Sequence, residues 1–258
     1  MTAIAEPDVA RRVVVATGQR FYVQLAAACV AVAVIGFAPT YWIPLFRGTL
    51  QVTPLTHVHG ALFYGWTLLF LAQAWLAASR KMTRHREFGV FGVAVATAMC
   101  FVGMAAAIAS LKQGTADGFG DASRAFAIVP VSGIAFFAGL FTLALLKVRR
   151  LETHKRLLIV ATVSLLQAAV GRVFLVALAP PGAAALGPPP VFVTILPGLV
   201  GDLLIVWAMI HDRKTRGHVH PVYWMAGGAL VALQVLRVPL STTPAWTGFA
   251  TWLGTFSM

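Results

Sequence analysis

Charged residues are scarce in this chain. Only 11% of its 258 residues are Asp, Glu, Lys or Arg, whereas 59% are hydrophobic. A soluble domain has about 25% charged and about 45–50% apolar residues, because its surface must hold water. The shortage of charge, together with a mean hydropathy of +0.82, therefore excludes an ordinary water-soluble fold.

Motifs of several common protein classes are also missing. The two cysteines, Cys29 and Cys100, lie in apolar segments and form no CxxC pair, so neither a disulfide framework nor a paired-cysteine zinc site is indicated. No phosphate-binding glycine loop, HExxH or GxSxG motif occurs. The last apolar segment contains no lysine to form a Schiff base, which excludes a retinal protein.

The apolar residues form seven blocks, near residues 21–43, 55–79, 88–111, 125–146, 157–179, 190–210 and 221–240. Each is about 20 residues or longer, the length that crosses about 30 Å of hydrocarbon as a helix. Backbone amides in lipid must be bonded within the segment, and alternating strand patterns are absent. The sequence predicts an all-α polytopic membrane bundle of about seven transmembrane helices over residues 21–240. Residues 1–20 are then a cytoplasmic segment, and residues 241–258 an external tail.

The basic residues predict how this bundle is oriented. Of 20 lysines and arginines, 15 lie before the first block or in the links after the second, fourth and sixth blocks. The positive-inside rule places these links and the N-terminus in the cytoplasm and the C-terminus outside, in a bacterial inner membrane. The net charge of +12 then predicts contact with the lipid bilayer and its anionic lipid at the cytoplasmic face, and no nucleic-acid partner.

The three basic links repeat one pattern, a basic pair followed after three residues by a histidine. The three copies are Arg80-Lys81 with His85, Arg149-Arg150 with His154, and Arg213-Lys214 with His218. The constant spacing predicts three helical hairpins in one orientation after the first helix. Enrichment of Lys and Arg at cytoplasmic bends is the alternative explanation for part of the pattern.

Two short motifs carry a resemblance to known families. His85-Arg86-Glu87-Phe88-Gly89 opens one helix, and His154-Lys155-Arg156-Leu157-Leu158 opens another. Within about residues 55–170 the chain resembles uncharacterised bacterial polytopic membrane protein families. It is similar, more distantly, to four-helix membrane b-type cytochromes. In these cytochromes two helices each offer a histidine at one membrane depth, so the resemblance implies haem b as a cofactor where such pairs exist.

The repeated histidines are the candidate metal ligands. His85, His154 and His218 begin three equivalent helices, and neutral imidazole binds haem iron, copper or zinc. We expect a metal site if the bundle brings them together at its inner mouth. The alternative is that they are interfacial residues that bond lipid phosphate or a neighbouring helix end, beside basic residues that disfavour a second cation.

Four further residues are candidates for cofactor binding. His57 and His59 open the second helix about 200° apart, so at most one faces the interior. Arg172 and Asp202 lie inside the fifth and sixth blocks, where a charged group needs a partner or a wet cavity. We expect an Arg172–Asp202 pair, either structural or part of a substrate, proton or propionate site. Pro197 is expected to kink the sixth helix and open a cavity beside Asp202.

These residues suggest three functional hypotheses. The first is a redox membrane protein that binds a cofactor or hydrophobic ligand, with b-type haem or a quinone as that ligand. The second is a small transporter or proton-coupled permease, indicated by the hairpin repeat and the Arg172–Asp202 pair. The third is a non-catalytic accessory or assembly subunit of a membrane complex. Besides the bilayer, the expected partners are a second copy of the chain in a homo-oligomer or a membrane-complex partner. The sequence leaves open whether the protein is an enzyme.

Overall fold

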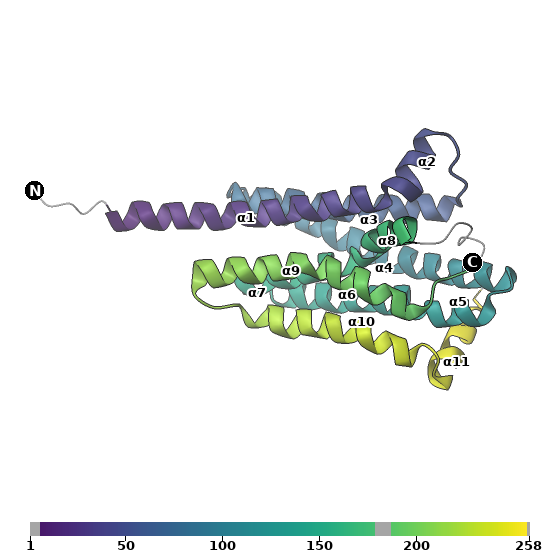
Figure 1. Ribbon diagram of the computed structural model, residues 1–258. Helices are drawn as coiled ribbons and strands as arrows, with labels where there is room; N and C mark the ends of the chain where they lie inside the picture. The colour runs from purple at the N-terminus through teal and green to yellow at the C-terminus, as the bar shows by residue number, and fades with distance from the viewer. Residues whose placement is uncertain (1–5, 179–186, 257–258) are drawn as a thin grey trace, which may run out of the picture.

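The computed structural model describes residues 6–178 and 187–256, with side chains from Arg20 onward. All regular elements in these ranges are helices. The long ones run side by side along one axis (Figure 1): α1 (Glu6–Phe37), α3 (Pro54–Ala78), α4 (Met82–Ala116), α6 (Ile128–Leu146), α7 (Leu151–Leu165), α8 (Gln167–Leu178), α9 (Ile195–Arg216) and α10 (Gly228–Leu240). The short ones are η1 (Ala38–Trp42), α2 (Ile43–Phe46), α5 (Gly120–Phe126), η3 (Val191–Thr194), η4 (Tyr223–Gly227) and α11 (Pro244–Leu253).

Seven helical stretches of the described chain are long and apolar enough to cross a membrane. They are Arg20–Phe46, Pro54–Ala78, Met82–Ala116, Gly120–Leu146, Leu151–Leu178, Val191–Arg216 and Tyr223–Leu240. Each overlaps one of the seven blocks predicted from the sequence, and the all-α membrane bundle is confirmed. The chain is therefore a multi-pass integral membrane protein in a lipid bilayer.

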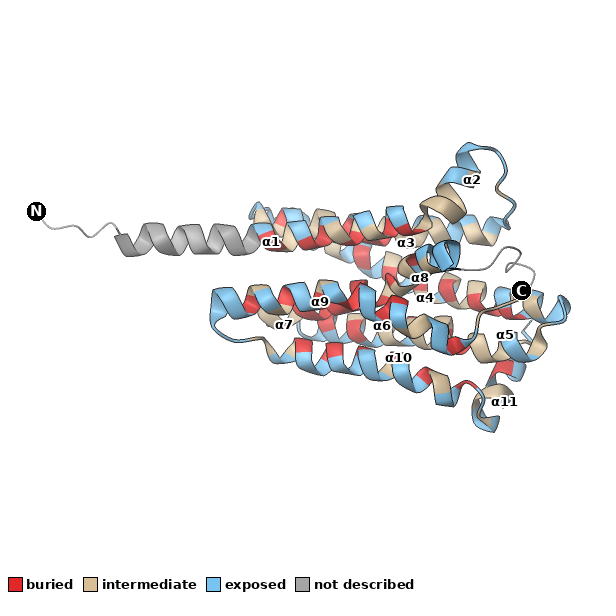
Figure 2. Cartoon of the chain, viewed as in Figure 1, coloured by how far each residue is buried: buried red, intermediate tan, exposed pale blue. Residues whose placement is uncertain are grey.

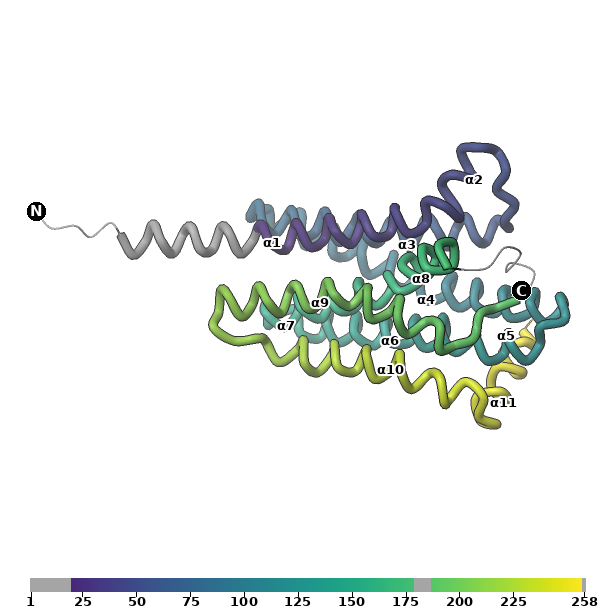
Figure 3. The backbone as a smooth tube through the Cα atoms, viewed as in Figure 1, coloured from purple at the N-terminus to yellow at the C-terminus, as the bar shows by residue number. Residues whose placement is uncertain are grey.

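Three helical hairpins turn at one end of the bundle, as the repeated motif predicts. α3 and α4, α6 and α7, and α9 and η4 are joined there by the bends at residues 79–81, 147–150 and 217–222, and we call this end the basic end (Figure 3). The third bend begins at Gly217, whose positive φ of 76° suits glycine after a helix. The short helices α2, α5 and α11 lie at the opposite end (Figure 1).

Proline positions explain one break and correct one prediction. α5 ends at Phe126, four residues before Pro130, because proline offers no amide hydrogen to that carbonyl and clashes with it. Pro197 lies in the first turn of α9, directly after the 3-10 turn η3, where the missing amide hydrogen is not needed. The kink that was expected at Pro197 in the sixth helix is not seen between Pro197 and Asp202, because α9 is a continuous α-helix from Ile195 through Asp202.

Burial divides the bundle into a packed interior and an apolar exterior (Figure 2). In the interior, Trp66 packs edge-on against Phe137 at 5.2 Å between ring centroids and donates from Nε1 to Thr162 Oγ1 at 3.2 Å. On the exterior, large apolar side chains such as Val90 and Phe101 are more than 70% exposed. An exposed apolar surface of this kind is what lipid chains cover.

The predicted C-terminal tail contains the helix α11. Its first turn is capped by Thr243, whose Oγ1 accepts a hydrogen bond from the Trp246 amide at 3.3 Å. Trp246 Nε1 donates to the Arg124 carbonyl at 2.8 Å. These contacts hold α11 against the end of α5, so part of residues 241–258 is folded onto the bundle.

Candidate functional site

The repeated histidines close their own hairpins. His85 Nδ1 lies 3.3 Å from the carbonyl oxygen of Gln73, and Gln73 Nε2 donates to the His85 carbonyl at 3.0 Å. His154 Nδ1 lies 2.8 Å from the carbonyl oxygen of Ala144. In both hairpins the ring bonds the backbone of the preceding helix, whereas His218 is exposed. The repeated histidine thus bonds the preceding helix in the first two hairpins, and it does not have this role in the third.

This arrangement does not fit a metal centre built from the three histidines. Within the described ranges, no group of three or more His, Cys, Asp or Glu side chains could hold a metal ion. His85 and His154 direct a ring nitrogen at a carbonyl of their own hairpin instead of at a shared point. The structure therefore does not bring these candidate ligands together.

His57 and His59 face different surroundings, as their spacing requires. His57 is exposed and its Nδ1 lies 2.8 Å from the hydroxyl of Tyr41. His59 is partly buried and stacks on Phe63 at 4.2 Å between ring centroids. The two rings lie at the start of α3, and no described contact joins them into one site.

Arg172 and Asp202 do not form the expected ion pair. No salt bridge among the described side chains joins them, and Arg172 is exposed on the bundle surface. The cause is the rotation of α8: Val170 faces α9, where a Cβ on Gly201 would lie 3.9 Å from its Cγ2. Arg172 follows two residues later, about 200° around the helix, and so points away.

Asp202 instead lines a cavity between α9 and α10, which we call the α9–α10 groove. Its volume is about 260 Å³. It is lined by Asp202, Ile205, Val206 and Met209 of α9, by Tyr223, Trp224 and Gly227 of η4, and by Gly228 and Val231 of α10. The α9 residues recur every three or four positions and so share one face of that helix. Val206 and Trp224 are 44% and 64% exposed, so the groove opens at the side of the bundle.

Three buried polar atoms at or beside this groove have no hydrogen-bond partner among the described residues. They are Asp202 Oδ2, the Tyr223 hydroxyl and Gln234 Oε1. Gln234 packs over Gly198, one turn before Asp202, since a Cβ on that glycine would lie 2.8 Å from the Gln234 Cδ. Burial of a polar atom without a partner is costly, so three such atoms in one region indicate a place for a bound molecule.

Backbone features keep the groove open. The segment η4 is a single π-helical turn, a feature common at functional sites. Two glycines lie at its end: a Cβ on Gly227 would touch Ile205 Cγ2 at 3.5 Å, and a Cβ on Gly228 would meet nothing within 4 Å. The groove therefore has room for a larger side chain at position 228.

A buried charge cluster lies at the basic end, beyond Tyr223. Arg156 is 0% exposed and donates to both carboxylate oxygens of Asp212, with Nε at 2.8 Å from Oδ2. Its Nη1 also donates to Glu152 Oε2 at 2.6 Å, and Arg216 bonds the same carboxylate. The Arg156 guanidinium lies 5.7 Å from the centre of the Tyr223 ring. These contacts join α7, α9 and η4.

The sequence interpretation did not identify this cluster. It treated Arg156 as one of many bend cations and gave no role to Glu152 or Asp212. The available signal was the scarcity of acids: the chain has only eight, and these two lie among the cations of the bends. A buried arginine in such a place requires a carboxylate partner.

Arg237 is a second buried cation that sequence reasoning missed as a site residue. It is 2% exposed, and its Nε and Nη1 donate to Ser132 Oγ and Gln167 Oε1, each at 2.7 Å. Gln167 Nε2 donates in turn to the Thr194 carbonyl at 2.9 Å. No described carboxylate forms a salt bridge with Arg237. The cation therefore holds α10 to α6, α8 and η3 through neutral groups.

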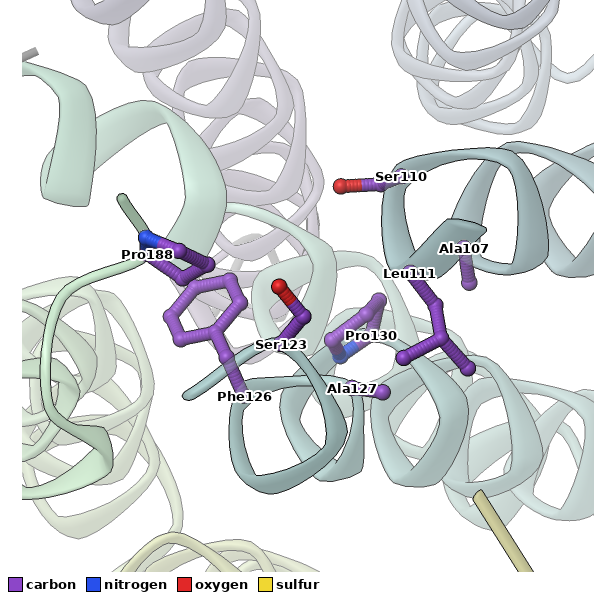
Figure 4. A pocket seen from close by; sticks show the side chains of 8 residues that line it. All are labelled: Ala107, Ser110, Leu111, Ser123, Phe126, Ala127, Pro130 and Pro188. Carbon is purple, nitrogen blue, oxygen red and sulfur yellow. The ribbon is translucent and has the colours of Figure 1, made fainter. Parts of the chain in front are cut away.

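A smaller cavity lies between α4, α5 and α6. Figure 4 shows the residues that line it, among them Ser110, Ser123, Pro130 and Pro188. The volume of this cavity is about 30 Å³. A bound water needs at least about 10–15 Å³ of such space, so this cavity suits water and not an organic ligand.

Comparisons with known proteins do not add a family. No family model matches the chain, and no curated protein or solved structure matches it. The fold defines an integral membrane protein with seven candidate spans, and its distinctive polar features are the α9–α10 groove and the buried charges.

Proposed function

We propose that this membrane protein binds a small lipid-soluble molecule, taken from the bilayer, in the α9–α10 groove. The observation that carries the proposal is the Asp202 carboxylate, which has an unpartnered oxygen and lines a cavity of about 260 Å³ with otherwise mostly apolar walls. Small-molecule sites combine apolar walls with a few polar groups in this way. Ionisable residues within membrane spans commonly mark ligand or ion pathways.

The groove supports a ligand site better than a haem site. No histidine lines it, and His85 and His154 bond carbonyls at the basic end. A quinone has the required shape, because it joins a small polar headgroup to an apolar tail. Of the redox hypothesis, the part that the groove supports is a lipid-soluble ligand, and not haem held by these histidines.

A variant that fills the groove tests the proposal. Gly228→Leu places a side chain in the space that a Cβ at this position finds empty. Gly139→Leu is the matched control, because position 139 on α6 is also exposed and open but does not line the groove. We expect Gly228→Leu, and not the control, to weaken binding of a neutral quinone or a lipophilic cation in nanodiscs at least about tenfold. Unchanged binding of both probes would contradict the proposal.

A small transporter is the second candidate function. It is favoured by the position of Asp202 in the middle of a span, with an oxygen free to bind a proton or a substrate. In proteoliposomes, Asp202→Asn should then abolish flux of the bound probe. If the probe binds in the groove but does not cross the membrane, the protein binds a ligand and the transporter function is excluded.

We also propose that the basic end faces the cytoplasm of a bacterial inner membrane. The support is the charge bias of the links, with 15 of 20 cations on that side. Thr215→Cys and Gln51→Cys place exposed thiols at the two ends. A membrane-impermeant maleimide added outside intact inner-membrane vesicles should label Gln51→Cys only in right-side-out vesicles. It should label Thr215→Cys only in inverted vesicles. The reverse pattern would overturn this orientation.

A further inference from the structure

The charge of Asp202 is unmatched in the described structure. It is the only charged residue that lines the α9–α10 groove, and none of the salt bridges among described residues includes it. Arg172 is exposed on another face, and Arg237 bonds Ser132 and Gln167. An ionised carboxylate in such a place needs a cation beside it.

The unpartnered atoms also specify the hydrogen-bonding character of the ligand. Gln234 Oε1 and an ionised Asp202 Oδ2 can only accept hydrogen bonds, and the Tyr223 hydroxyl can donate or accept. A donor or a cation satisfies two acceptors at once. The carbonyl oxygens of a neutral quinone only accept, so they would leave these two atoms without partners.

The walls of the groove suit an organic cation. Trp224 supplies an aromatic ring, whose face attracts cations, and Met209 supplies a polarisable thioether. The Tyr223 ring lies 5.7 Å from the Arg156 guanidinium, so Tyr223 contributes its hydroxyl and not a face for a second cation. Ile205 and Val231 add aliphatic surface for an apolar body. A metal ion would find one carboxylate and too few oxygen ligands within a space this wide.

The depth of Asp202 in the bilayer distinguishes such a ligand from an ordinary lipid headgroup. Asp202 is eleven residues from Val191 in the span Val191–Arg216, which is about 17 Å of helix. The hydrocarbon core of a bilayer is about 30 Å thick, so this carboxylate lies near its middle. The headgroup amines of bilayer lipids lie at the surface, and a cation that reaches Asp202 must be carried by its own apolar body.

We infer that the α9–α10 groove takes a lipophilic organic cation, an amine or onium group on an apolar body, with Asp202 as its counter-ion. This inference rests on the proposed function, since it assigns a chemical class to the ligand of the same groove. The aromatic ring of Trp224 lies beside the cation, and Gln234 accepts from an amine that has a free N–H.

The test compares two probes that differ in charge, tetraphenylphosphonium and the neutral decylubiquinone. Both are titrated against purified protein in nanodiscs, with tryptophan fluorescence and equilibrium dialysis as readouts. We expect Asp202→Asn to weaken tetraphenylphosphonium binding at least about tenfold and to leave quinone binding unchanged. Asp202→Glu, which keeps the charge, should retain cation binding. Thermal unfolding midpoints confirm that each variant is folded.

The outcomes separate the inference from the proposed function. If Asp202→Asn leaves tetraphenylphosphonium binding unchanged while Gly228→Leu abolishes it, a molecule binds in the groove but its charge is not recognised, and the inference is overturned. If only the quinone binds, and Gly228→Leu blocks it, the ligand is neutral and the inference is also overturned. If Gly228→Leu affects neither probe, the proposed function itself fails.

Discussion

Arg156 and Asp212 form a two-bond ion pair that is closed off from water inside the basic end. The guanidinium Nε and Nη2 each donate to one carboxylate oxygen, and both residues are 0% exposed. The partners are 56 positions apart, on α7 and α9. Because a guanidinium and a carboxylate meet in one planar geometry, the pair fixes how the second and third hairpins lie against each other.

Removal of both partners of this pair should destabilise the fold by less than the two single removals added together. Arg156→Ala leaves the Asp212 carboxylate buried without its cation, and Asp212→Ala leaves Arg156 with the Glu152 carboxylate alone. The first should cost about 3–5 kcal/mol of unfolding free energy, and the second less. The double variant should cost less than the sum of the two, because it leaves neither charge buried alone. The measurement is a double-mutant cycle in SDS titrations of detergent-solubilised protein. Simple additivity would show that the two residues do not interact.

Replacement of Asp202, in contrast, should not destabilise the fold. Its carboxylate is buried and one of its oxygens has no partner, so Asp202→Leu removes a polar atom whose burial is costly. We expect the unfolding free energy to stay equal or to rise, while tetraphenylphosphonium binding is lost, as is typical of a functional residue. The same titration measures stability, with Asp212→Leu as the destabilising comparison. A marked loss of stability in Asp202→Leu would assign Asp202 a structural role.

The repeated histidines should differ in their contribution to stability. His154 bonds the Ala144 carbonyl, whereas His218 is exposed. His154→Ala should therefore lower the unfolding free energy by about 0.5–1.5 kcal/mol, the usual net value of one hydrogen bond. His218→Ala should leave it unchanged. Equal effects at both positions would contradict the assignment of a hairpin-closing role to His154.

Gly36 should not tolerate even one methyl group. A Cβ at this position would lie 2.5 Å from the backbone oxygen of Ala169, where α1 meets α8. The backbone cannot move aside as a flexible side chain can, so we expect Gly36→Ala to destabilise the protein by about 1–3 kcal/mol. Gly60→Ala is the control, because a Cβ there meets nothing within 4 Å. Thermal unfolding of the two variants in one detergent makes the comparison.

His220 should make the stability depend on pH. Its pKa is lowered, first because the ring is partly removed from water and then because Arg156 and Arg216 add positive potential. The unfolded chain therefore takes up a proton at higher pH than the folded chain, and stability should fall as the pH drops below about 6.5. His220→Gln should reduce this slope. Thermal midpoints measured from about pH 8 to about pH 5 check the prediction.

The sequence predicted the spans because its signal is local. An apolar run of about 20 residues must be a helix wherever it lies in a bilayer, since its amides have no other partners. The spacing of His85 and His154 likewise predicted equivalent bends. The π-helical turn at Tyr223 and the folded tail at Trp246 have no comparable local pattern, and neither was predicted.

Which side chains meet at the site depends on how each helix is rotated about its own axis, and the sequence did not reveal this rotation. Arg172 and Asp202 carry opposite charges inside two consecutive apolar blocks, and this was the basis for expecting that they pair. In the structure Val170 occupies the contact with α9, and Arg172 is directed outward. The aspartate that does pair with an arginine is Asp212, near the end of the same helix as Asp202, and its partner is Arg156.

The sequence by itself determined the class of this protein: the number of spans, their approximate limits and the end at which the cations gather. The tertiary structure alone decided which polar groups meet, leaving Asp202 in an open groove and enclosing Arg156 with Asp212. The physical reason is that burial in lipid acts on each segment separately, whereas contacts between helices depend on how each helix is turned about its axis.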